Sequence, residues 1–352
     1  MNNNNPSKIL IRAANWVGDA IMTTPVIRAI RKHYPSAHIS LLAKPWVIPV
    51  FEHNPHVDEI IVYENDGRHK KGWGTICLAR DLRKYRFDIA ILMQNAFEAA
   101  LITFLAGIPV RIGYNTDGRT LLLNPSIKMD KKLKKGHLID YYRGILKGAS
   151  IADNGGYQEL FVTDNERAKA KRFLEDNGIA DYAGTGRAEQ PVIGLNPGAT
   201  GGTAKRWFPQ RYAELARKLS DCFNVKILLF GGPGDEALGD FINSCSGNVC
   251  INLAGHTSLR DAFALIEKCS LFITNDSGLM HVAAALHTPQ IAIIGSTDPV
   301  ATSPASYNSR MLRVQVPCSP CLKPHCPVDH ACMDKISVDM VMDAAMAKMA
   351  EQ

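Results

Sequence analysis

The hydrophobic and polar positions of this chain repeat as a short apolar run followed by a helical pattern. The first half predicts buried strands at residues 9–14, 38–42, 59–62, 88–93 and 110–113, with helices near 19–30, 75–85 and 96–105. A charged helix is expected near 165–177. Strands at 192–196, 226–230, 271–274 and 290–294 then alternate with or precede helices near 210–220, 258–268, 279–286 and 338–350. This alternation predicts an α/β fold with parallel sheets covered by helices on both faces.

The length of the chain and the restart of the pattern indicate two domains. At 352 residues the chain is long for one compact core. We expect two Rossmann-like, doubly wound domains that face one another across a cleft, over residues 1–180 and 181–335. Residues 336–352 are expected to form a C-terminal helix that could return to the N-terminal domain. Ligands of open α/β sheets bind beyond the carboxyl ends of the strands, so the loops at those ends are candidate sites.

Composition places the chain among ordinary globular proteins of the cytoplasm. Hydrophobic residues make up 46% and charged residues 21% of it. The most apolar stretch, residues 89–110, is interrupted by Gln94, Asn95 and Glu98, so a membrane span is not expected. The first eight residues lack the pattern of a secretion signal. In the cytoplasm, the nine cysteines are expected to be mostly reduced thiols.

The positive charge is concentrated in the first half. Residues 1–150 hold 22 Lys/Arg and 12 Asp/Glu, whereas residues 151–352 hold 18 and 22. This asymmetry favours an anionic partner for the N-terminal half, although a solvated surface is the plainer interpretation. Basic residues are not interleaved with aromatic ones as a nucleic-acid-binding stripe would require, so no nucleic-acid partner is expected.

The loop after the first predicted strand, residues 15–19, contains a single glycine. A dinucleotide-binding domain would carry G-x-G-x-x-G at this place, so nicotinamide binding is not favoured and no cofactor is expected. Asp19 has two interpretations. It could be the N-cap of the following helix, or a general base at the end of a strand, and the residues alone favour the cap.

Three loops of the second half are suited to a nucleotide diphosphate. The stretch 200–205 (Thr-Gly-Gly-Thr-Ala-Lys) combines backbone amides with the cation of Lys205. Asn275-Asp-Ser-Gly278 starts a helix, whose N-terminus attracts phosphate. Gly231–Gly234 precedes Asp235 and Glu236, which could accept the hydroxyls of a ribose. Each loop alone could be an ordinary turn, but three at one sheet edge favour a ligand site.

Four cysteines lie close together near the C-terminus: Cys318, Cys321, Cys326 and Cys332. C-x2-C is a spacing of metal ligands, and four thiols could close a tetrahedral site. A second C-x2-C pair is missing, however, and four nearby prolines suggest a rigid extended loop. A structural metal is therefore the less favoured interpretation of this segment.

Four strings of residues resemble the ADP-heptose:lipopolysaccharide heptosyltransferases of glycosyltransferase family 9. They are Trp16-Val-Gly-Asp19, Ala106-Gly-Ile-Pro109, Ala204-Lys-Arg-Trp207 and the run Asn275–Leu286 that begins Asn-Asp-Ser-Gly-Leu-Met-His. The resemblance covers nearly the whole chain. It implies a GT-B fold, with the acceptor on the N-terminal domain and ADP-heptose on the C-terminal one. The implied reaction is inverting transfer of L-glycero-D-manno-heptose to the first heptose of the lipopolysaccharide inner core.

The resemblance also implies roles for particular residues. Asp19 would be the catalytic base, and Lys205 would neutralise the leaving diphosphate. The implied donor-binding residues are Thr200, Gly201, Lys205, Glu236, Asp276, Ser277, Gly278 and His281, with Glu236 on the ribose and Asp276 on the heptose. The chain has no Asp-x-Asp pair, so no catalytic metal is expected.

The implied acceptor is a phosphorylated lipid A–core glycolipid, met in peripheral contact with the cytoplasmic face of the inner membrane. Two basic clusters are candidates to bind its phosphates: Arg68, Lys70 and Lys71, and the run Lys131, Lys132, Lys134 and Lys135. Both could equally be solvated loops. Three alternatives stay open: a family member acting on the first or a later core heptose, a nucleotide-sugar epimerase, and a metal- or redox-sensing module built on the cysteines.

Overall fold

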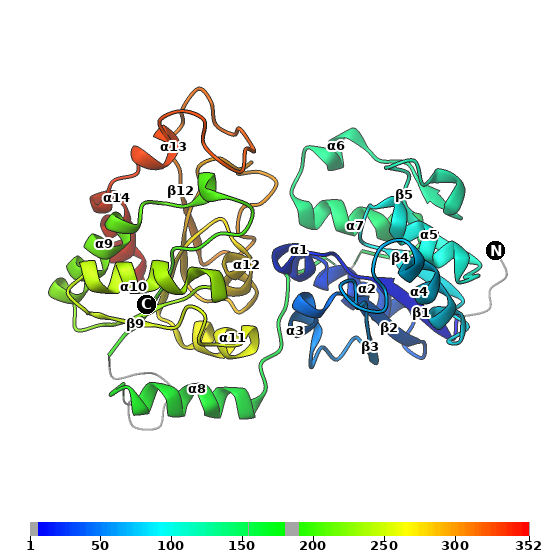
Figure 1. Ribbon diagram of the computed structural model, residues 1–352, viewed down its shortest axis with the longest axis horizontal. Coiled ribbons are helices and arrows are strands. Elements are labelled where there is room, and N and C mark those ends of the chain that lie inside the picture. Colours follow the sequence, from blue (N-terminus) through cyan, green and yellow to red (C-terminus); the bar gives the residue numbers. More distant parts are fainter. Residues whose placement is uncertain (1–5, 154, 180–189, 352) are drawn as a thin grey trace. The chain divides into compact units, whose positions relative to one another are not determined.

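The computed structural model describes residues 6–153, 155–179 and 190–351, and it divides into two compact units. The first unit comprises residues 1–161 and the second residues 162–352. Each unit contains one six-stranded sheet with helices packed on it (Figure 1). All the strand pairs within these two sheets are parallel, as the alternating pattern predicts.

The sheet of the first unit has the strand order β3-β2-β1-β4-β5-β6. Its strands are β1 (Lys8–Arg12), β2 (His38–Ala43), β3 (Glu59–Val62), β4 (Ile89–Leu92), β5 (Val110–Tyr114) and β6 (Ser126–Ile127). The helices are α1 (Val17–Met22), α2 (Thr24–His33), α3 (Ile48–Phe51), α4 (Trp73–Arg83), α5 (Phe97–Leu105), α6 (Lys131–Lys134) and α7 (Leu138–Gly148), with 3-10 turns η1 (Pro45–Val47) and η2 (Thr120–Leu122). The chain winds outward from β1 to β3, then returns to β4 and winds the other way.

The sheet of the second unit has the order β12-β11-β10-β7-β8-β9, which repeats the same winding plan. Its strands are β7 (Val192–Asn196), β8 (Lys226–Leu229), β9 (Cys250–Asn252), β10 (Leu271–Asn275), β11 (Gln290–Ile293) and β12 (Ser309–Leu312). The helices are α8 (Asp164–Asp176), α9 (Pro209–Cys222), α10 (Glu236–Cys245), α11 (Leu259–Lys268), α12 (Gly278–Ala285), α13 (Ala331–Asp334) and α14 (Val338–Ala350), with turns η4 (Thr203–Lys205) and η5 (Pro233–Asp235).

Burial explains why the central strands are so apolar. Ile9, Leu10 and Ile11 of β1 are fully buried, and so is every residue of β10. Both faces of a parallel sheet are covered by helices, so strands of this kind read as continuous apolar runs rather than as alternating ones. The prediction of two doubly wound α/β units is confirmed.

The boundary between the units falls after Phe161, before α8, and not at residue 180 as the sequence suggests. Helix α8 belongs to the second unit because it packs on α11. Arg260 of α11 donates two hydrogen bonds to Glu166, at 2.7 and 2.6 Å, and Arg167 pairs with Glu267 at 2.8 Å. The expected boundary at residues 180–181 itself lies outside the described residues.

The C-terminal helix forms where it is predicted, at Val338–Ala350. Its contacts are with α9, β10 and β11 of the second unit. Val341, Ala344 and Ala345 are fully buried there, so the helix is part of the core of this unit. Among the described residues, no helix is both long enough and apolar enough to cross a bilayer.

Candidate active site

The three candidate donor loops follow three adjacent strands, β10, β7 and β8. The winding direction of the second sheet reverses between β7 and β10, because the chain goes from β7 to β8 and β9 before it returns to β10. In open α/β sheets such a reversal leaves a crevice at the carboxyl ends of the strands, where ligands bind. The loops of residues 197–205 and 276–278 lie on the two sides of this point.

Two buried asparagines join these loops. The side-chain amide of Asn196 donates to the hydroxyls of Thr274, at 2.9 Å, and Ser277, at 2.7 Å. Asn275 donates to the carbonyl oxygen of Pro197 at 2.7 Å, and its Oδ1 accepts from the backbone amide of Trp207 at 3.0 Å. Because buried polar groups are costly to leave unpaired, these bonds hold both loops in one arrangement.

Lys205 and Asp276, both predicted from the sequence, meet at this point. Nζ of Lys205 lies 3.5 Å from Oδ2 of Asp276, and the Asp276 side chain is only 5% exposed. The hydroxyl of Thr302 lies 3.2 Å from the same oxygen and 3.1 Å from the carbonyl oxygen of Asp298, and its proton is donated to one of the two. The second carboxylate oxygen is not part of either contact. The pair therefore presents a cation beside a buried carboxylate, and Thr302 is a partner that sequence reasoning missed.

The remaining predicted residues of the diphosphate site lie around this pair. Thr200 and Gly201 are exposed at the tip of the loop after β7, where Gly201 has a φ of +95°. Gly278 is the first residue of α12, and Ser277 occupies its N-cap position. The N-terminal amides of a helix attract phosphate. His281, in the first turn of α12, is buried. Ser277, Gly278 and His281 thus follow Asp276 directly along the chain, at the start of α12.

The two carboxylates after β8 have different surroundings. Asp235 pairs with Arg206 at 3.2 Å and accepts a hydrogen bond from the amide of Gly232 at 3.2 Å. Arg206 also donates to the carbonyl of Ala199 at 3.2 Å, so Asp235 ties its own loop to the loop after β7. Glu236 starts α10 and is more than half exposed, with His256 at 3.5 Å. Glu236 is therefore the more exposed of the two carboxylates.

We define residues 318–332 as the cysteine-rich segment. This segment packs against the turn that carries Lys205. The backbone amide of Ala204 donates to the carbonyl of Pro324 at 3.0 Å. Nε2 of His330 lies 3.0 Å from the carbonyl oxygen of Ala204, and Nδ1 of His325 lies 3.1 Å from the Thr203 hydroxyl. These contacts connect residues more than a hundred positions apart, so no local pattern indicates them.

Gly202 is required by this contact. A Cβ atom at residue 202 would lie 2.0 Å from the carbonyl oxygen of Pro324, and φ of Gly202 is +127°. Both the close approach and the backbone conformation favour glycine. The segment therefore supports the turn of Lys205 from outside.

The nine cysteines are free in this structure. Within the ranges that the structure describes, no group of three or more His, Cys, Asp or Glu side chains is arranged to hold a metal ion. Burial, and then the proximity of Cys318, Cys321 and Cys326, raises the pKa of Cys332 above its ordinary value.

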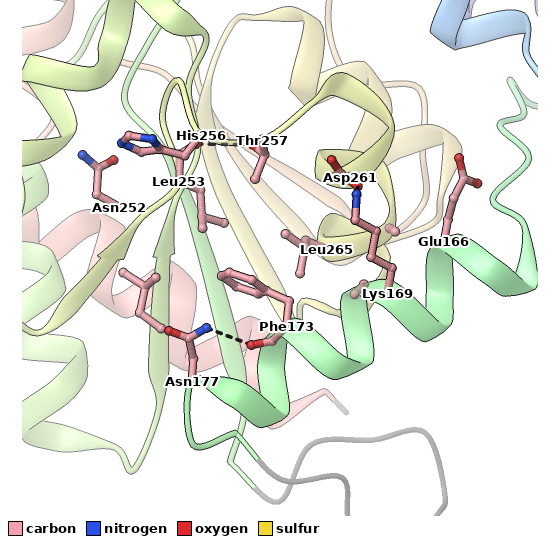
Figure 2. A pocket seen from close by; sticks show the side chains of 13 residues that line it. Glu166, Lys169, Phe173, Asn177, Asn252, Leu253, His256, Thr257, Asp261 and Leu265 are labelled. Carbon is pink, nitrogen blue, oxygen red and sulfur yellow. Dashed lines mark hydrogen bonds and ion pairs between the residues drawn. The ribbon is translucent and has the colours of Figure 1, made fainter.

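A cavity of about 280 Å³ lies between α8, α11 and the end of β9 (Figure 2). Phe173, Leu253 and Leu265 give it an apolar wall, and the ion pair between Lys169 and Asp261, at 2.6 Å, lies at its rim. Its lining residue His256 also contacts Glu236, which connects this cavity to the candidate ribose carboxylate. Its walls come from distant segments, so no local sequence pattern indicates it.

In the first unit, Asp19 is not a helix cap. Helix α1 begins at Val17, and Trp16 occupies the N-cap position. Asp19 lies in the first turn, at the carboxyl end of β1, and the hydroxyl of Tyr142 donates to its Oδ1 at 3.0 Å. Burial, and then the nearby carboxylate, raises the pKa of Tyr142 well above its usual value, so this phenol stays a proton donor. The interpretation of Asp19 as a cap is therefore wrong.

Tyr142 packs on Tyr141, whose hydroxyl belongs to a hydrogen-bonded network with Asn95 and Arg119. The Tyr142 ring packs edge-on against Tyr141, with ring centroids 5.3 Å apart. The Tyr141 hydroxyl is hydrogen-bonded to Asn95, whose Oδ1 accepts from the buried Arg119 at 2.8 Å. Asn95 follows β4, and Asp19 follows β1, the two strands between which the first sheet reverses its winding. Asp19 thus lies at the place where its own sheet reverses its winding, which is called the switch point of the sheet.

A second buried arginine shapes the loop that carries Trp16 and Asp19. Arg12, at the end of β1, donates to the Ala13 carbonyl at 2.7 Å and to Oδ1 of Asn15 at 2.9 Å. Burial lowers its pKa to about 10, partly opposed by Tyr63 and Glu98, so it remains charged at neutral pH. Sequence reasoning missed Arg12 because it reads as part of an apolar strand.

The candidate acceptor cations are on the surface of the first unit. Arg68 is paired with Asp81 at 2.8 Å, whereas Lys70 and Lys71 are exposed in the turn before α4. Lys132, Lys134 and Lys135 are exposed on or just after α6. The turn with Lys70 follows β3, which is separated from β1 by β2 alone. Strands are roughly 4.8 Å apart, so β3 lies about 10 Å from the strand that precedes Asp19.

Comparison with known proteins identifies the class. The model of glycosyltransferase family 9 (heptosyltransferase) matches residues 76–332. Lipopolysaccharide heptosyltransferase 2 of Escherichia coli strain K12 is 35% identical over 324 residues, covering 87% of this chain and 88% of that protein. Lipooligosaccharide heptosyltransferase 2 of Haemophilus influenzae is 32% identical over 323 residues, with the same coverage.

Solved structures support the same family. The structure of E. coli ADP-heptose lps heptosyltransferase II has a TM-score of 0.81 and 32% identity, covering 98% of this chain and 99% of that one. A family 9 glycosyl transferase from Veillonella parvula has a TM-score of 0.85 and 25% identity, covering 98% of both chains. Two doubly wound sheets with these relatives define a GT-B glycosyltransferase. The chain belongs to glycosyltransferase family 9, and it is a heptosyltransferase enzyme.

Proposed function

We propose that this enzyme transfers L-glycero-D-manno-heptose from ADP-heptose to the first heptose of the lipopolysaccharide inner core, with inversion at the anomeric carbon. The observation that carries the donor half is the Lys205–Asp276 pair at the switch point, 3.5 Å apart and beside the start of α12. A cation and helix amides at one place suit a diphosphate leaving group. The relatives, a lipopolysaccharide heptosyltransferase and an ADP-heptose lps heptosyltransferase, support the choice of substrates.

The reaction requires one base and one site for the leaving group. An acceptor hydroxyl attacks the anomeric carbon, and Asp19 takes the proton of this hydroxyl. The new bond joins the acceptor oxygen to that carbon, and the bond between the carbon and the diphosphate oxygen breaks. The electron pair leaves with ADP, whose growing charge is met by Lys205 and the amides near Gly278. In this proposal Asp276 holds both Lys205 and the heptose, and Glu236 accepts the ribose hydroxyls.

Tyr142 orients the base in this mechanism. Its hydroxyl occupies Oδ1 of Asp19 at 3.0 Å, and the high pKa of Tyr142 keeps that proton in place. A fixed donor on one oxygen restricts rotation of the carboxylate. The acceptor phosphates would be met by Lys70, Lys71 and the lysines of α6, at the cytoplasmic face of the inner membrane.

The proposal is tested by incubating the purified enzyme with ADP-heptose and defined truncated core acceptors, followed by mass spectrometry and analysis of the anomeric configuration. We expect one added heptose on the acceptor that ends in a single heptose, with release of ADP. A product formed only on the heptose-free acceptor, or only on the acceptor that already carries two heptoses, would assign the enzyme to the first or a later step. Retention of configuration would contradict the inverting mechanism.

A further inference from the structure

Two neighbouring helices of the first unit expose apolar side chains together with cations. Trp73 and Ile76 on α4 are 77% and 46% exposed, and Phe97 and Phe104 on α5 are each 47% exposed. Leu121 of η2, which packs beside α5, is 93% exposed. We define the α4–α5 face as these five residues with the cations Lys70, Lys71, Arg80 and Arg83.

The exposed residues of α4 form one stripe. Trp73, Ile76, Arg80 and Arg83 are spaced as i, i+3, i+7 and i+10, which places them on one side of a helix. The opposite side, with Leu78 and Leu82, is buried in the core that also holds Ala100 and Ile102 of α5. Because both helices cover the same core and pack on one another, their exposed residues face away from the sheet together.

The two lysines are held at the N-terminal end of this stripe by a folded turn. His69 is buried, and its Nδ1 accepts a hydrogen bond from the amide of Glu64 at 3.2 Å. A Cβ on Gly74 would lie 2.4 Å from the carbonyl carbon of His69, so the turn packs tightly against the helix start. Lys70 and Lys71 therefore project from a built turn next to Trp73.

The charge of this face is positive. Residues 64–86 contain seven Lys/Arg and three Asp/Glu. One of the acids, Asp81, is already paired with Arg68 at 2.8 Å and Lys84 at 3.1 Å. A second copy of the chain that packed the same face on this one would bring like charges together, which opposes association.

We infer that the α4–α5 face binds the surface of an anionic phospholipid bilayer. This inference rests on the proposed function in one respect, because a lipid-anchored acceptor would bring the enzyme to such a surface. Tryptophan is favoured at the membrane interface, and apolar side chains next to lysine and arginine are typical of elements that lie on a membrane. Each basic residue near an anionic surface adds attraction that salt weakens.

The test uses the full-length enzyme and vesicles without any acceptor. We expect co-sedimentation with phosphatidylglycerol-containing vesicles and little with phosphatidylcholine vesicles, and we expect added salt to weaken it. The double variant Trp73→Ser/Ile76→Ser should bind the anionic vesicles roughly tenfold more weakly, and Arg80→Gln roughly fivefold more weakly. The matched control Tyr307→Ser/Met311→Ser removes two exposed apolar side chains from the second unit and should bind like the wild type.

A second measurement separates this inference from the proposed function. With a water-soluble, delipidated acceptor, Trp73→Ser/Ile76→Ser should keep wild-type turnover, which also shows that it folds. Vesicle binding that depends on Trp73 supports the inference even if no heptose is transferred. Unchanged vesicle binding by the double variant overturns it. A concentration-dependent dimer in sedimentation, lost in the same variant, overturns it as well and assigns the face to self-association.

Discussion

The hydroxyl of Tyr142 donates a 3.0 Å hydrogen bond to Oδ1 of Asp19, across 123 positions of the sequence. The bond joins α7 to α1. Removing the tyrosine hydroxyl therefore tests whether this bond orients the carboxylate of Asp19.

The first prediction compares Asp19→Asn with Tyr142→Phe. Loss of the base should lower kcat by about 10²–10⁴-fold, while ADP binding is unchanged. Tyr142→Phe keeps the base and the ring packing but removes the orienting bond, so we expect a smaller fall of kcat, by roughly tenfold. Steady-state kinetics with titration calorimetry of ADP measures both. Wild-type turnover by Asp19→Asn would exclude this residue as the base.

The second prediction concerns the cation at the leaving group. Lys205→Ala should lower kcat by about 10²–10³-fold, in the range of other losses of transition-state charge stabilisation, and Lys205→Arg should lower it less. The arginine keeps the charge beside Asp276, although its planar head differs in shape. The measurement is kcat under saturating ADP-heptose. Equal values for the alanine, arginine and wild-type enzymes would remove Lys205 from the mechanism.

The third prediction tests the support given by the cysteine-rich segment. Gly202→Ala should weaken ADP binding, because its Cβ would lie 2.0 Å from the carbonyl oxygen of Pro324. Gly247→Ala, in the turn after α10 and outside the candidate donor loops, is the matched control. It has a φ of +86° but open space around its Cβ, so it adds only backbone strain of about 1–2 kcal/mol. Calorimetry of ADP binding and thermal unfolding compare the two. Equal losses would show that strain, and not contact with Pro324, sets the effect.

The fourth prediction is a pH dependence of stability in the second unit. Arg260 and the cap residue Thr163 lower the pKa of Glu166 from 4.5 to about 2, although burial alone would raise it. Since the folded-state pKa is depressed, this stabilisation is present above the unfolded value and is lost as pH falls from about 4.5 to about 2. Glu166→Gln should therefore reduce the free energy of unfolding at neutral pH by up to about 3 kcal/mol.

Urea unfolding of both proteins at a series of pH values measures this difference. The difference in the free energy of unfolding between the wild type and Glu166→Gln should become steadily smaller as the pH falls from about 4.5 to about 2. The control is Asp164→Asn, two residues earlier in the same turn of α8, whose fully exposed side chain should give only a small difference. A Glu166→Gln difference that stays constant with pH would assign the effect to lost packing and not to charge.

The sequence predicts the parts of the fold that depend on local apolar runs. Strands β1, β7 and β10 are buried on both faces, so each appears in the sequence as a mostly apolar run. The short β6 and β12 were not predicted, because half or more of their residues are partly or fully exposed and they carry polar side chains such as Ser309 and Arg310. They are held as strands by pairing with β5 and β11, which a local pattern does not contain.

The same distinction applies to the site. Lys205 and Asp276 could be predicted together because each follows a strand, and parallel strands end at one edge of a sheet. Thr302 and Tyr142 could not, since they reach the site from elements distant in sequence and carry no motif. The tight contact of Gly202 with Pro324 is also a property of the folded chain alone.

We expect the thiols of the cysteine-rich segment to report binding of the donor nucleotide. Its backbone and two histidines contact the turn of Lys205, while Cys318 is exposed and Cys321 and Cys326 are partly so. A ligand that orders the turn also steadies the segment on which these thiols lie. The rate at which a thiol-specific dye labels them should then follow ADP saturation, so that the enzyme's own sulfur atoms measure how full its nucleotide site is.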